Sequence, residues 1–574
     1  MSKKAHVSRG HRPWAVRFGS DSRHGHTVSN TKGIAATIPF VLTANGHLHM
    51  LGRMIRRNAA TVLFLVLWPM ACACERAEPS RERSIPQTLV IPEYQVLIPL
   101  NPLATTTLSA RLVELIFDGL TRLDERLEVQ PHLAVRWTVS EDHRTWRFDL
   151  RQGVQFHDGA ELTAEDVQWT FDWLRALPRK SAYSYAFHQI DRVAATEKYA
   201  VEISLREPRA SFLGDLRVGI LPRHFLEKYD LTAADFHTPI VGTGPFKVKR
   251  QSEREIVLDA NEEYFLGRPA LDQIVATVYP NQESAWAGLM RNEVGFFPFL
   301  VPTNYDLLTQ VSTVARYSVL KPYYYVLMFN TRSPFFQDRR VRQALNYAVN
   351  KEEIVAKILR ERGRVAAGTI YPNSWAYDPA THPYAYDPRK ALAMLSAAGW
   401  RDHDGDHLLD RDGRLFKFTV YTNRGDDVKQ QSLLLIQREL FDLGIVMEVN
   451  VLDAAGVEIL FQKQFEMVFL EMDAGGDPDL SYKFWHSSQA RGGFNFGSYR
   501  NPTVDRLLEA GRRAFDRADR KTIYARFQRE LFDDPPGIFL FWTDYLVGVN
   551  ERIKGVKISP AGPFANIHEW SVEN

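Results

Sequence analysis

The chain has 574 residues, enough for two or three domains, and its 45% hydrophobic content without repeats or low-complexity tracts indicates a packed globular protein. Its net charge of +2 is unevenly distributed. The first 73 residues hold ten Lys/Arg against one Asp and so carry +9, which leaves −7 for the rest. A nucleic-acid-binding protein concentrates basic residues in its folded part, so this distribution argues against nucleic acid as a partner.

The N-terminal part has the order of a secretory leader. Residues 54–73 place Arg56 and Arg57 before the apolar run 59–70, which small residues follow, as in a signal peptide. The run is shorter than the roughly 20 apolar residues that a transmembrane helix needs. Residues 1–53 are expected to be a disordered upstream extension outside the fold. The sequence therefore predicts export to the periplasmic or cell-surface side of the membrane.

The two cysteines of the chain, Cys72 and Cys74, both lie at the expected cleavage point. The remaining sequence can form neither a disulfide framework nor a thiolate metal site. A small-residue segment that ends in cysteine resembles the lipobox of bacterial lipoproteins, and this resemblance implies a lipid anchor on Cys74. Residues 71–73 also fit a plain A-x-A cleavage site. Residues 74–84 are then a polar linker.

The mature part begins with short elements that its pattern predicts in order. We expect a strand over 87–100 and a helix over 108–117 that ends before an Asp-Gly pair. Alternating polar and apolar residues over 135–139 and 145–150 then predict a hairpin of two half-buried strands.

Two later helices are predicted from an N-cap and an apolar stripe. The first has Thr163 as its N-cap, with acidic residues in its first turn. The second begins near Asp338, and its stripe is expected to face a core. The stripes consist of Val167, Phe171 and Leu174 in the first helix, and of Val341, Leu345, Ala348 and Val349 in the second.

A series of short motifs runs along the chain in a fixed order. They are Phe117-Asp-Gly-Leu120, Gly153 to Gly159, Leu162 to Val167, Val241-Gly-Thr-Gly-Pro-Phe246, Asn261 to Pro269, Asp338 to Lys351, Gly399-Trp400, Gly444-Ile-Val446 and Asn501 to Leu507. In this order they resemble the bacterial oligopeptide- and dipeptide-binding proteins, family 5 of the extracellular solute-binding proteins of ABC importers. The likeness runs over about residues 85–570.

This resemblance implies an α/β, two-lobed periplasmic-binding-protein fold with an extra subdomain inserted in the first lobe. The implied boundaries are residues 85–318 for the first lobe, 319–537 for the second lobe and 538–574 for a return to the first. Because the chain crosses between the lobes twice, we expect a hinge that closes on a ligand. The implied partners of this monomer are a short peptide or other small molecule, an ABC permease and ATPase subunits, and the membrane through a lipid anchor.

Searches for catalytic patterns give no candidate. Gly242-Thr-Gly-Pro245 predicts a tight turn into a strand, because it lacks the third glycine and the following helix of a dinucleotide-binding loop. The sequence contains no H-E-x-x-H, G-x-S-x-G or P-loop pattern, and its 17 histidines form no clear ligand pattern. We therefore predict a protein that is not an enzyme, with no catalytic residues, no cofactor and no metal site.

One aspartate-rich loop leaves calcium as an alternative. Asp402, Asp404 and Asp406 alternate as in a calcium-binding loop. Such a loop needs Gly at its sixth position and Glu at its twelfth, where this chain has His407 and Gly413. The pattern favours a solvated hairpin tip.

The stretch most suggestive of a binding site lies late in the chain. An apolar run over 467–470 predicts a buried strand, and it leads into a glycine-containing loop with Asp473, Asp477 and Asp479. Glycine lets the backbone approach a guest closely, and three nearby carboxylates can receive a cationic group. Without a ligand, the same stretch is a strand-to-helix turn with Asp479 as the helix N-cap.

The resemblance assigns roles to residues around this loop. In peptide-binding members of the family, a carboxylate just before such a turn receives the α-ammonium group of the peptide. That role falls on Asp473, with Asp477 in reserve because the spacing is one residue longer than usual. The other residues expected to contact the ligand, some of which also fit a core position, are Asp479, Trp485, Tyr323 and Phe494.

Three other kinds of function stay open at this point. The family also contains binders of nickel, haem and sugar derivatives, so a non-peptide solute is one alternative. A secreted, membrane-tethered hydrolase is another, and it would need a paired nucleophile and base. A lobed protein that senses a ligand without transporting it would have the same sequence features.

The lipid anchor can be tested by metabolic labelling with palmitate in bacteria that express the chain. Cys74→Ser should abolish incorporation, because the acylated thiol is removed, whereas Cys72→Ser should keep it. Unchanged labelling of the Cys74→Ser variant would contradict the assignment, and loss in Cys72→Ser alone would move the anchor to Cys72.

Overall fold

The structure is a computed structural model that describes residues 87–94, 100, 111–177, 184–229, 240–452 and 458–573. All of these residues belong to one compact unit, residues 83–574. The expected extension, signal peptide and linker, including Cys74, lie outside the described residues. Among the residues that are described, no helix is both long and apolar enough to cross a membrane.

Near its N-terminal end the described chain forms a four-stranded sheet in the order β1-β10-β9-β8. Strand β1 pairs with β10 in parallel, and the other neighbours are antiparallel. The strand expected over 87–100 begins as β1, which ends at Glu93, and residues 95–99 lie outside the described residues. The strands are β1 (Thr88–Glu93), β8 (Phe246–Gln251), β9 (Glu255–Ala260) and β10 (Gln273–Val278).

The expected helix over 108–117 is shorter than its pattern indicates. Of its described residues, 111–113 are helical and the following three form a turn. The N–H groups of Leu115 and Ile116 donate to carbonyl groups three residues earlier, so this turn is tighter than an α-helix, and their own carbonyl groups accept hydrogen bonds from the N–H groups of Phe246 and Gly244. A Cβ atom on Gly242 would lie 2.0 Å from the Ile116 carbonyl oxygen, which explains the glycine of this turn.

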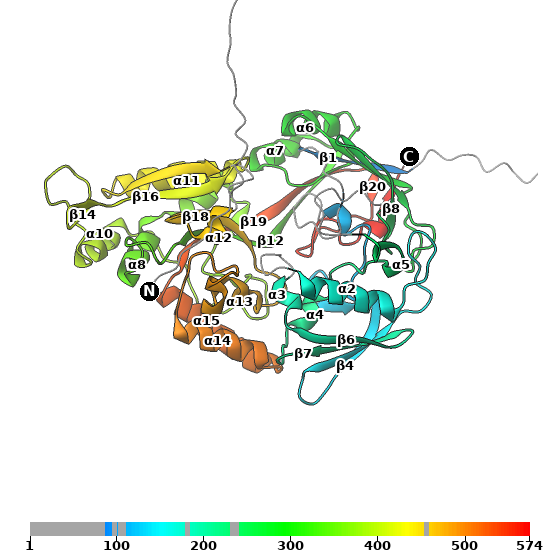
Figure 1. Ribbon diagram of the computed structural model, residues 1–574. Coiled ribbons are helices and arrows are strands. Elements are labelled where there is room, and N and C mark those ends of the chain that lie inside the picture. The colour runs from blue at the N-terminus through cyan, green and yellow to red at the C-terminus, as the bar shows by residue number, and fades with distance from the viewer. Residues whose placement is uncertain are drawn as a thin grey trace, which may run out of the picture. The chain divides into compact units, whose positions relative to one another are not determined.

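A second four-stranded sheet, β4-β5-β7-β6, is antiparallel throughout. Strands β4 (Ala134–Val139) and β5 (Thr145–Leu150) confirm the expected hairpin. Strands β6 (Ile190–Glu197) and β7 (Ala200–Leu205) complete the sheet. We call this sheet, together with helices α2 and α4 that pack on it, the small subdomain (Figure 1).

Helix α2 (Ala164–Ala176) confirms the helix predicted from Thr163. The Asp166 carboxylate accepts a hydrogen bond from the Thr163 N–H at 2.9 Å, which satisfies a donor at the helix start. The apolar stripe is fully buried in the core of the small subdomain, where its residues are Val167, Phe171 and Leu174.

The largest sheet has seven strands in the order β11-β19-β12-β18-β16-β17, with β13 also paired to β19. Its two longest strands, β12 and β19, lie side by side in antiparallel pairing (Figure 1). We call this sheet with its covering helices the large-sheet lobe. The strands are β11 (Phe296–Phe297), β12 (Val314–Phe329), β13 (Gly363–Val365), β16 (Lys417–Asn423), β17 (Val446–Leu452), β18 (Met467–Asp473) and β19 (Gly537–Asn550).

The pairing of β12 with β19 is interrupted between Leu320 and Tyr324. Leu320 faces Asp544 and Tyr324 faces Trp542, so three residues of β12 stand opposite one residue of β19. Pro322 lies inside this interval and has no N–H group to donate to the ladder. An irregularity of this kind bends a strand pair, and it lies close to the expected boundary between the lobes.

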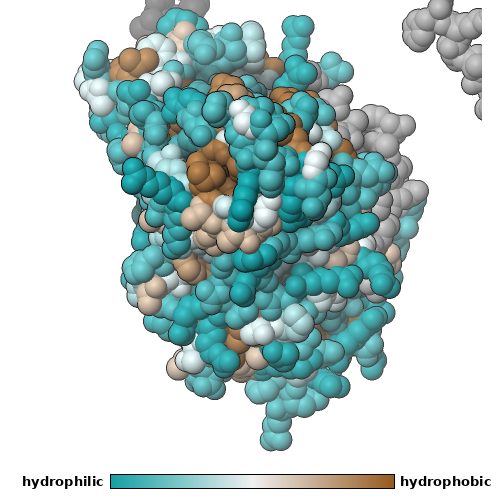
Figure 2. All heavy atoms as spheres, turned by 90° about the vertical axis from the view of Figure 1, so that its left-hand side faces the viewer, coloured by the Kyte–Doolittle hydropathy of each residue, from teal (hydrophilic) through white to brown (hydrophobic). Residues whose placement is uncertain are grey.

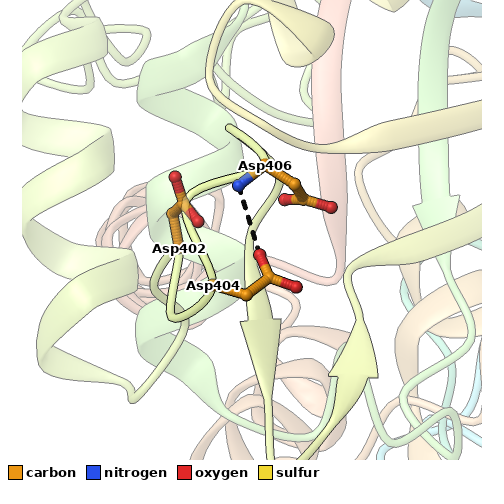
Figure 3. Close-up of side chains that lie close together, drawn as sticks. All are labelled: Asp402, Asp404 and Asp406. Carbon is orange, nitrogen blue, oxygen red and sulfur yellow. Dashed lines mark hydrogen bonds between the residues drawn. The ribbon is translucent and has the colours of Figure 1, made fainter.

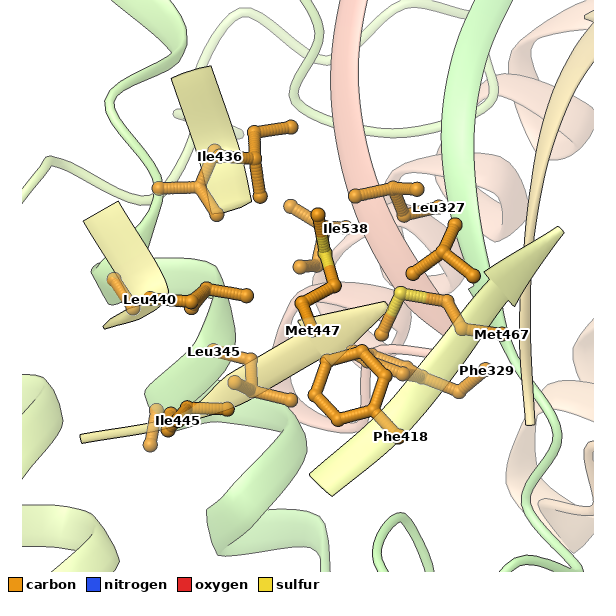
Figure 4. Close-up of a cluster of buried hydrophobic side chains, with 14 of the residues drawn as sticks. Leu327, Phe329, Leu345, Phe418, Ile436, Leu440, Ile445, Met447, Met467 and Ile538 are labelled. Carbon is orange, nitrogen blue, oxygen red and sulfur yellow. The ribbon is translucent and has the colours of Figure 1, made fainter. Parts of the chain in front are cut away.

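The core of the large-sheet lobe lies between the sheet and its helices (Figure 4). Helix α8 (Arg339–Ala348) confirms the helix predicted from Asp338, whose side chain accepts the Arg340 N–H at 2.8 Å. Helix α11 (Asp427–Phe441) contributes buried residues to the same core. The buried side chains that meet in Figure 4 include Leu345, Phe418, Ile436, Met447 and Met467.

The other helices and strands complete the fold. The remaining helices are α3 (Ser184–Phe187), α4 (Phe212–Asp215), α5 (Arg223–Leu226), α6 (Gln282–Met290), α7 (Pro302–Leu307), α9 (Lys351–Glu353), α10 (Pro388–Ala397), α12 (Glu458–Gln462), α13 (Leu480–Trp485), α14 (Pro502–Arg513) and α15 (Arg517–Asp533). The remaining strands are β2 (Thr121–Leu123), β3 (Val129–Pro131), β14 (Asp410–Arg411), β15 (Arg414–Leu415), β20 (Ile553–Lys554) and β21 (Ser571–Val572).

The surface on the side of β14, α10 and α8 is mostly hydrophilic, with separate hydrophobic groups (Figure 2). Exposed hydrophobic residues in this lobe include Leu434 and Phe441 of α11, which are 64% and 60% exposed. Isolated apolar groups of this kind are common on soluble proteins and do not by themselves mark an interface.

A buried glutamate in α11 makes the stability of the large-sheet lobe depend on pH. Burial raises the pKa of Glu439 to about 7, although its carboxylate accepts the Asn350 N–H at 3.1 Å. The contribution of protonated Glu439 to the free energy of unfolding is therefore fully present below about pH 4, and it is lost as the pH rises through 7. Glu439→Gln should unfold with a free energy about 1–2 kcal/mol higher than the parent at pH 8, with little difference at pH 4.5, in urea titrations. Glu352→Gln, at an exposed position, is the control, and equal effects at both pH values would contradict the prediction.

Candidate functional site

The acidic loop begins where β18 reaches the interruption of β12. Asp473, the last residue of β18, pairs with Tyr323 of β12, and the Ala474 N–H donates to the Pro322 carbonyl at 2.8 Å. The strand thus continues three residues beyond the apolar run over 467–470. This pairing places the Asp473 carboxylate beside the bend that separates the two halves of β12.

A cavity of about 190 Å³ lies in front of this loop. Its walls come from the large-sheet lobe, through Asp473 and Gly476, and from the small subdomain, through the segment from Arg209 to Arg217. A Cβ atom on Gly476 would lie 2.6 Å from the Leu127 carbonyl oxygen, so glycine permits the close approach of the loop to the turn between β2 and β3, which also lines the cavity. The cavity is smaller than the roughly 300 Å³ at which small-molecule pockets usually begin.

Asp473 is partly buried, and within the part of the chain that is described it has no ion-pair partner. Its carboxylate accepts the Gly475 N–H at 2.7 Å. Burial raises the pKa of Asp473, while the Gly475 hydrogen bond and the charge of Arg217 oppose the rise. The charge of Asp473 in turn is the main cause that raises the pKa of Tyr323 well above its usual value. Arg217 and Lys483 are thus close enough to act on the Asp473 charge, but within the described residues neither forms an ion pair with it.

Asp477 differs from Asp473 because a cation already holds it. Its two carboxylate oxygens accept hydrogen bonds from the two terminal nitrogens of Arg520, at 2.8 and 2.5 Å. It also accepts the Asp479 N–H at 2.9 Å. A two-pronged pair of this kind fixes both side chains.

Asp479 is completely buried between the small subdomain and the large-sheet lobe. Its carboxylate lies 3.1 Å from the Arg209 Nε and 3.0 Å from the Arg512 Nε, and the Ser211 hydroxyl donates to it at 2.7 Å. Burial opposes ionisation, but the two arginines together hold the pKa of Asp479 far below its usual value. Asp479 occupies the N-cap position of α13 without a capping hydrogen bond, so the expected capping role is replaced by this ion-pair cluster.

The three predicted aromatic residues lie in different surroundings. Tyr323 is beside Asp473, as the strand pairing requires. Trp485 is fully buried and packs against Phe539, with ring centroids 5.8 Å apart. Phe494 is half-buried, and the Lys483 ammonium lies 4.3 Å from its ring centroid. Contact of these residues with a ligand stays a prediction, and the geometry favours Tyr323.

Several residues of the site were not predicted. Arg209 is 270 residues from Asp479 in the chain, and no local pattern indicates that the two meet. A second hollow shares Leu123 and Arg217 with the cavity and contains Glu114. Glu114 is exposed, yet the surrounding protein raises its pKa, so it lies in an open space that protein encloses on several sides.

The aspartate-rich loop forms a separate acidic group (Figure 3). One carboxylate oxygen from each of Asp402, Asp404 and Asp406 lies within 4.8 Å of the others, and all three residues are exposed. Asp402 accepts the N–H groups of Gly405 and His407, and Asp404 accepts the Asp406 N–H at 3.2 Å. These bonds are those of a self-contained surface loop, and calcium binding stays an untested alternative.

Several known proteins are similar to this chain in sequence and in structure. Residues 128–494 match the family model described as bacterial extracellular solute-binding proteins, family 5 Middle. The oligopeptide-binding protein AppA of Bacillus subtilis is 30% identical over 480 residues, 81% of this chain and 88% of that protein. The crystal structure of that AppA with a nonapeptide has a TM-score of 0.77 at 28% identity, over 86% of this chain and 100% of that chain. NikZ of Campylobacter jejuni, in complex with Ni(L-His), has a TM-score of 0.76 at 29% identity, over 85% of this chain and 100% of that chain.

The buried Asp479 cluster can be separated from a surface pair by substitution. Asp479→Asn should lower the free energy of unfolding by about 3–5 kcal/mol, because buried Arg512 loses its counter-ion and buried Arg209 keeps only Asp215. Glu207→Gln is the matched control, since it breaks the exposed Glu207–Arg513 pair, which also joins the small subdomain to α14, and should cost about 1 kcal/mol or less. Denaturant titration without added peptide gives both values, and similar small losses would contradict the role assigned to Asp479.

Proposed function

We propose that this chain, which belongs to the bacterial extracellular solute-binding proteins of family 5, captures a short peptide between its two lobes and delivers it to an ABC permease. Its fold is the two-lobed α/β fold of the periplasmic binding proteins to which it is similar. The observation that carries the proposal is the Asp473 carboxylate, which lines the cavity and forms no ion pair with any described residue.

The chemistry of Asp473 suits the α-ammonium group of a peptide. A carboxylate in a poorly hydrated space is costly unless a cation pairs with it, so an entering ammonium group gains more there than at the surface. Asp477 and Asp479 cannot take this part without losing Arg520 or the two arginines of the buried cluster. Of the three acids in the loop, Asp473 is therefore the proposed ligand contact.

The peptide backbone and side chains would occupy more space than the 190 Å³ cavity next to Asp473. We propose that they extend toward the hollow that contains Glu114 and Arg217, because the two spaces share Leu123 and Arg217. Binding then brings opposite walls together at the bend of β12, and the peptide is released unchanged.

The finer assignments belong to the same proposal. We propose that the mature protein is a monomer, held by its lipid anchor on the outer side of the membrane. The lobe boundaries at 318 and 537 are proposed from the long strands β12 and β19, which both connect the two halves of the fold. A non-peptide solute remains the alternative, since NikZ, which is similar in structure, was solved with Ni(L-His).

Calorimetry on Asp473→Asn tests the peptide contact. With a peptide that the parent binds, the variant should lose about two to four decades of affinity, and N-acetylation of the peptide should cause a similar loss in the parent. The two effects should overlap rather than add, because both remove the same ion pair. Asp404→Asn, an exposed acid in another loop, is the control and should bind like the parent.

The pH dependence gives a second readout of the same contact. The ammonium group pairs with the ionised carboxylate, so parent affinity should fall as the pH drops through the raised pKa of Asp473, and Asp473→Asn should lose this dependence. If Asp477→Asn weakens binding while Asp473→Asn does not, the ligand contact lies at Asp477, and the loop spacing that is one residue longer than usual has misplaced it. If neither substitution weakens binding, the ligand is not an amine-bearing peptide.

A further inference from the structure

Two adjoining hollows lie apart from the Asp473 cavity, with which they share no lining residue. The larger, about 990 Å³, is lined by residues of 331–342 and 487–500 in the large-sheet lobe. The smaller, about 360 Å³, lies between residues 488–494 and the small subdomain. They share Ser488 and Arg491, and we call them together the arginine groove.

The arginine groove is lined by six arginines and, among the residues that the structure describes, by no Asp or Glu. The part of the chain after residue 73 has a net charge of −7, so a basic lining is not what average composition produces. The arginines are Arg332, Arg342, Arg491 and Arg500 in the larger hollow, and Arg175, Arg206 and again Arg491 in the smaller one.

Three arginines of the larger hollow have no counter-ion among the described residues. Arg332, Arg491 and Arg500 are exposed, and none of their guanidinium groups forms an ion pair or hydrogen bond with another described residue. Arg342 is different, because it is buried, pairs with Asp534 and donates to the Phe336 carbonyl at 2.7 Å. Arg342 thus stabilises the wall, while the other three leave positive charge uncompensated.

The charge of the groove acts on a neighbouring lysine. Lys463 donates a hydrogen bond to the Asn495 carbonyl, and its pKa is lowered to about 8, first by burial and then by the like charge of Arg332. The lining also presents the Ser498 hydroxyl group as a neutral donor, whereas the Thr331 hydroxyl donates to the Gly497 carbonyl at 3.0 Å and the Ser488 hydroxyl lies 2.8 Å from the His486 Nδ1. Positive charge combined with hydroxyl donors is the lining that an oxyanion requires.

We propose that the arginine groove binds a phosphate-bearing anion at a site separate from the peptide site. The guanidinium group presents paired N–H donors that match phosphate oxygens, and three unpaired arginines suit a multiply charged anion better than a single carboxylate. The larger hollow has the volume of a small-molecule site, within the usual range of about 300–1,000 Å³. The phosphate can belong to a free compound or to an anionic lipid headgroup, and the same donors serve both.

A charge-matched pair of triple variants tests the site on the full-length protein. Arg332→Gln, Arg491→Gln and Arg500→Gln are combined in one variant, and the exposed Arg254→Gln, Arg389→Gln and Arg552→Gln in the control. In calorimetric titration with inorganic pyrophosphate at low salt, the groove variant should bind at least tenfold more weakly than the parent. The control should stay within twofold, although both variants lose three positive charges.

Vesicles distinguish the two sources of phosphate. If the site takes lipid headgroups, the parent and the control should co-sediment with phosphatidylglycerol vesicles more than with phosphatidylcholine vesicles, and the groove variant should not. If it takes free phosphate, only the pyrophosphate titration should separate the groove variant from the control. The proposal is overturned if the groove variant and the control behave alike with both probes. Peptide affinity, measured in parallel, should be unchanged in the groove variant, so this result is independent of Asp473.

Discussion

Asp479 is a carboxylate without solvent contact, held between Arg209 of the small subdomain and Arg512 of α14. A lone carboxylate could not be buried there, because the loss of hydration would force it to take up a proton. Two guanidinium groups and the Ser211 hydroxyl replace the lost water. This ion-pair cluster fixes the loop that follows β18 against the small subdomain, and the geometry of the candidate site depends on that position.

The cluster also determines which acid of the loop is available. Asp477 and Asp479 each have arginine partners, so their charges stabilise the fold. Asp473 lies four to six residues earlier, where β18 still pairs with β12, and the strand pairing directs it toward the cavity rather than toward these arginines. Of these three acids, Asp477 and Asp479 thus stabilise the fold, and Asp473 lines the cavity without an arginine partner.

Most of the local structure could be predicted from the sequence, because its causes are local. The N-caps at Thr163 and Asp338 and the apolar stripes of α2 and α8 lie within a few residues of one another, and the structure confirms both helices. The family and the two-lobed fold could be predicted as well, because many short motifs keep their order over the whole chain.

The errors arise where distant segments meet. The helix expected up to residue 117 tightens into a turn after residue 113, where carbonyl groups bond to Gly244 and Phe246, more than 120 residues away. The partners of Asp479 were missed for the same reason, as nothing in the acidic loop indicates an arginine 270 residues earlier.

The charged groups of this protein therefore have to be sorted by their partners rather than by type. Asp479 and Arg342 are buried and paired, and their charges hold segments together. Asp473 and Arg491 carry charges of opposite sign, and neither has a counter-ion among the residues that are described. An uncompensated charge in an enclosed space attracts an ion of the opposite sign from outside the chain. The uncompensated charges of Asp473 and Arg491 are thus the basis on which we propose binding at the cavity and at the groove.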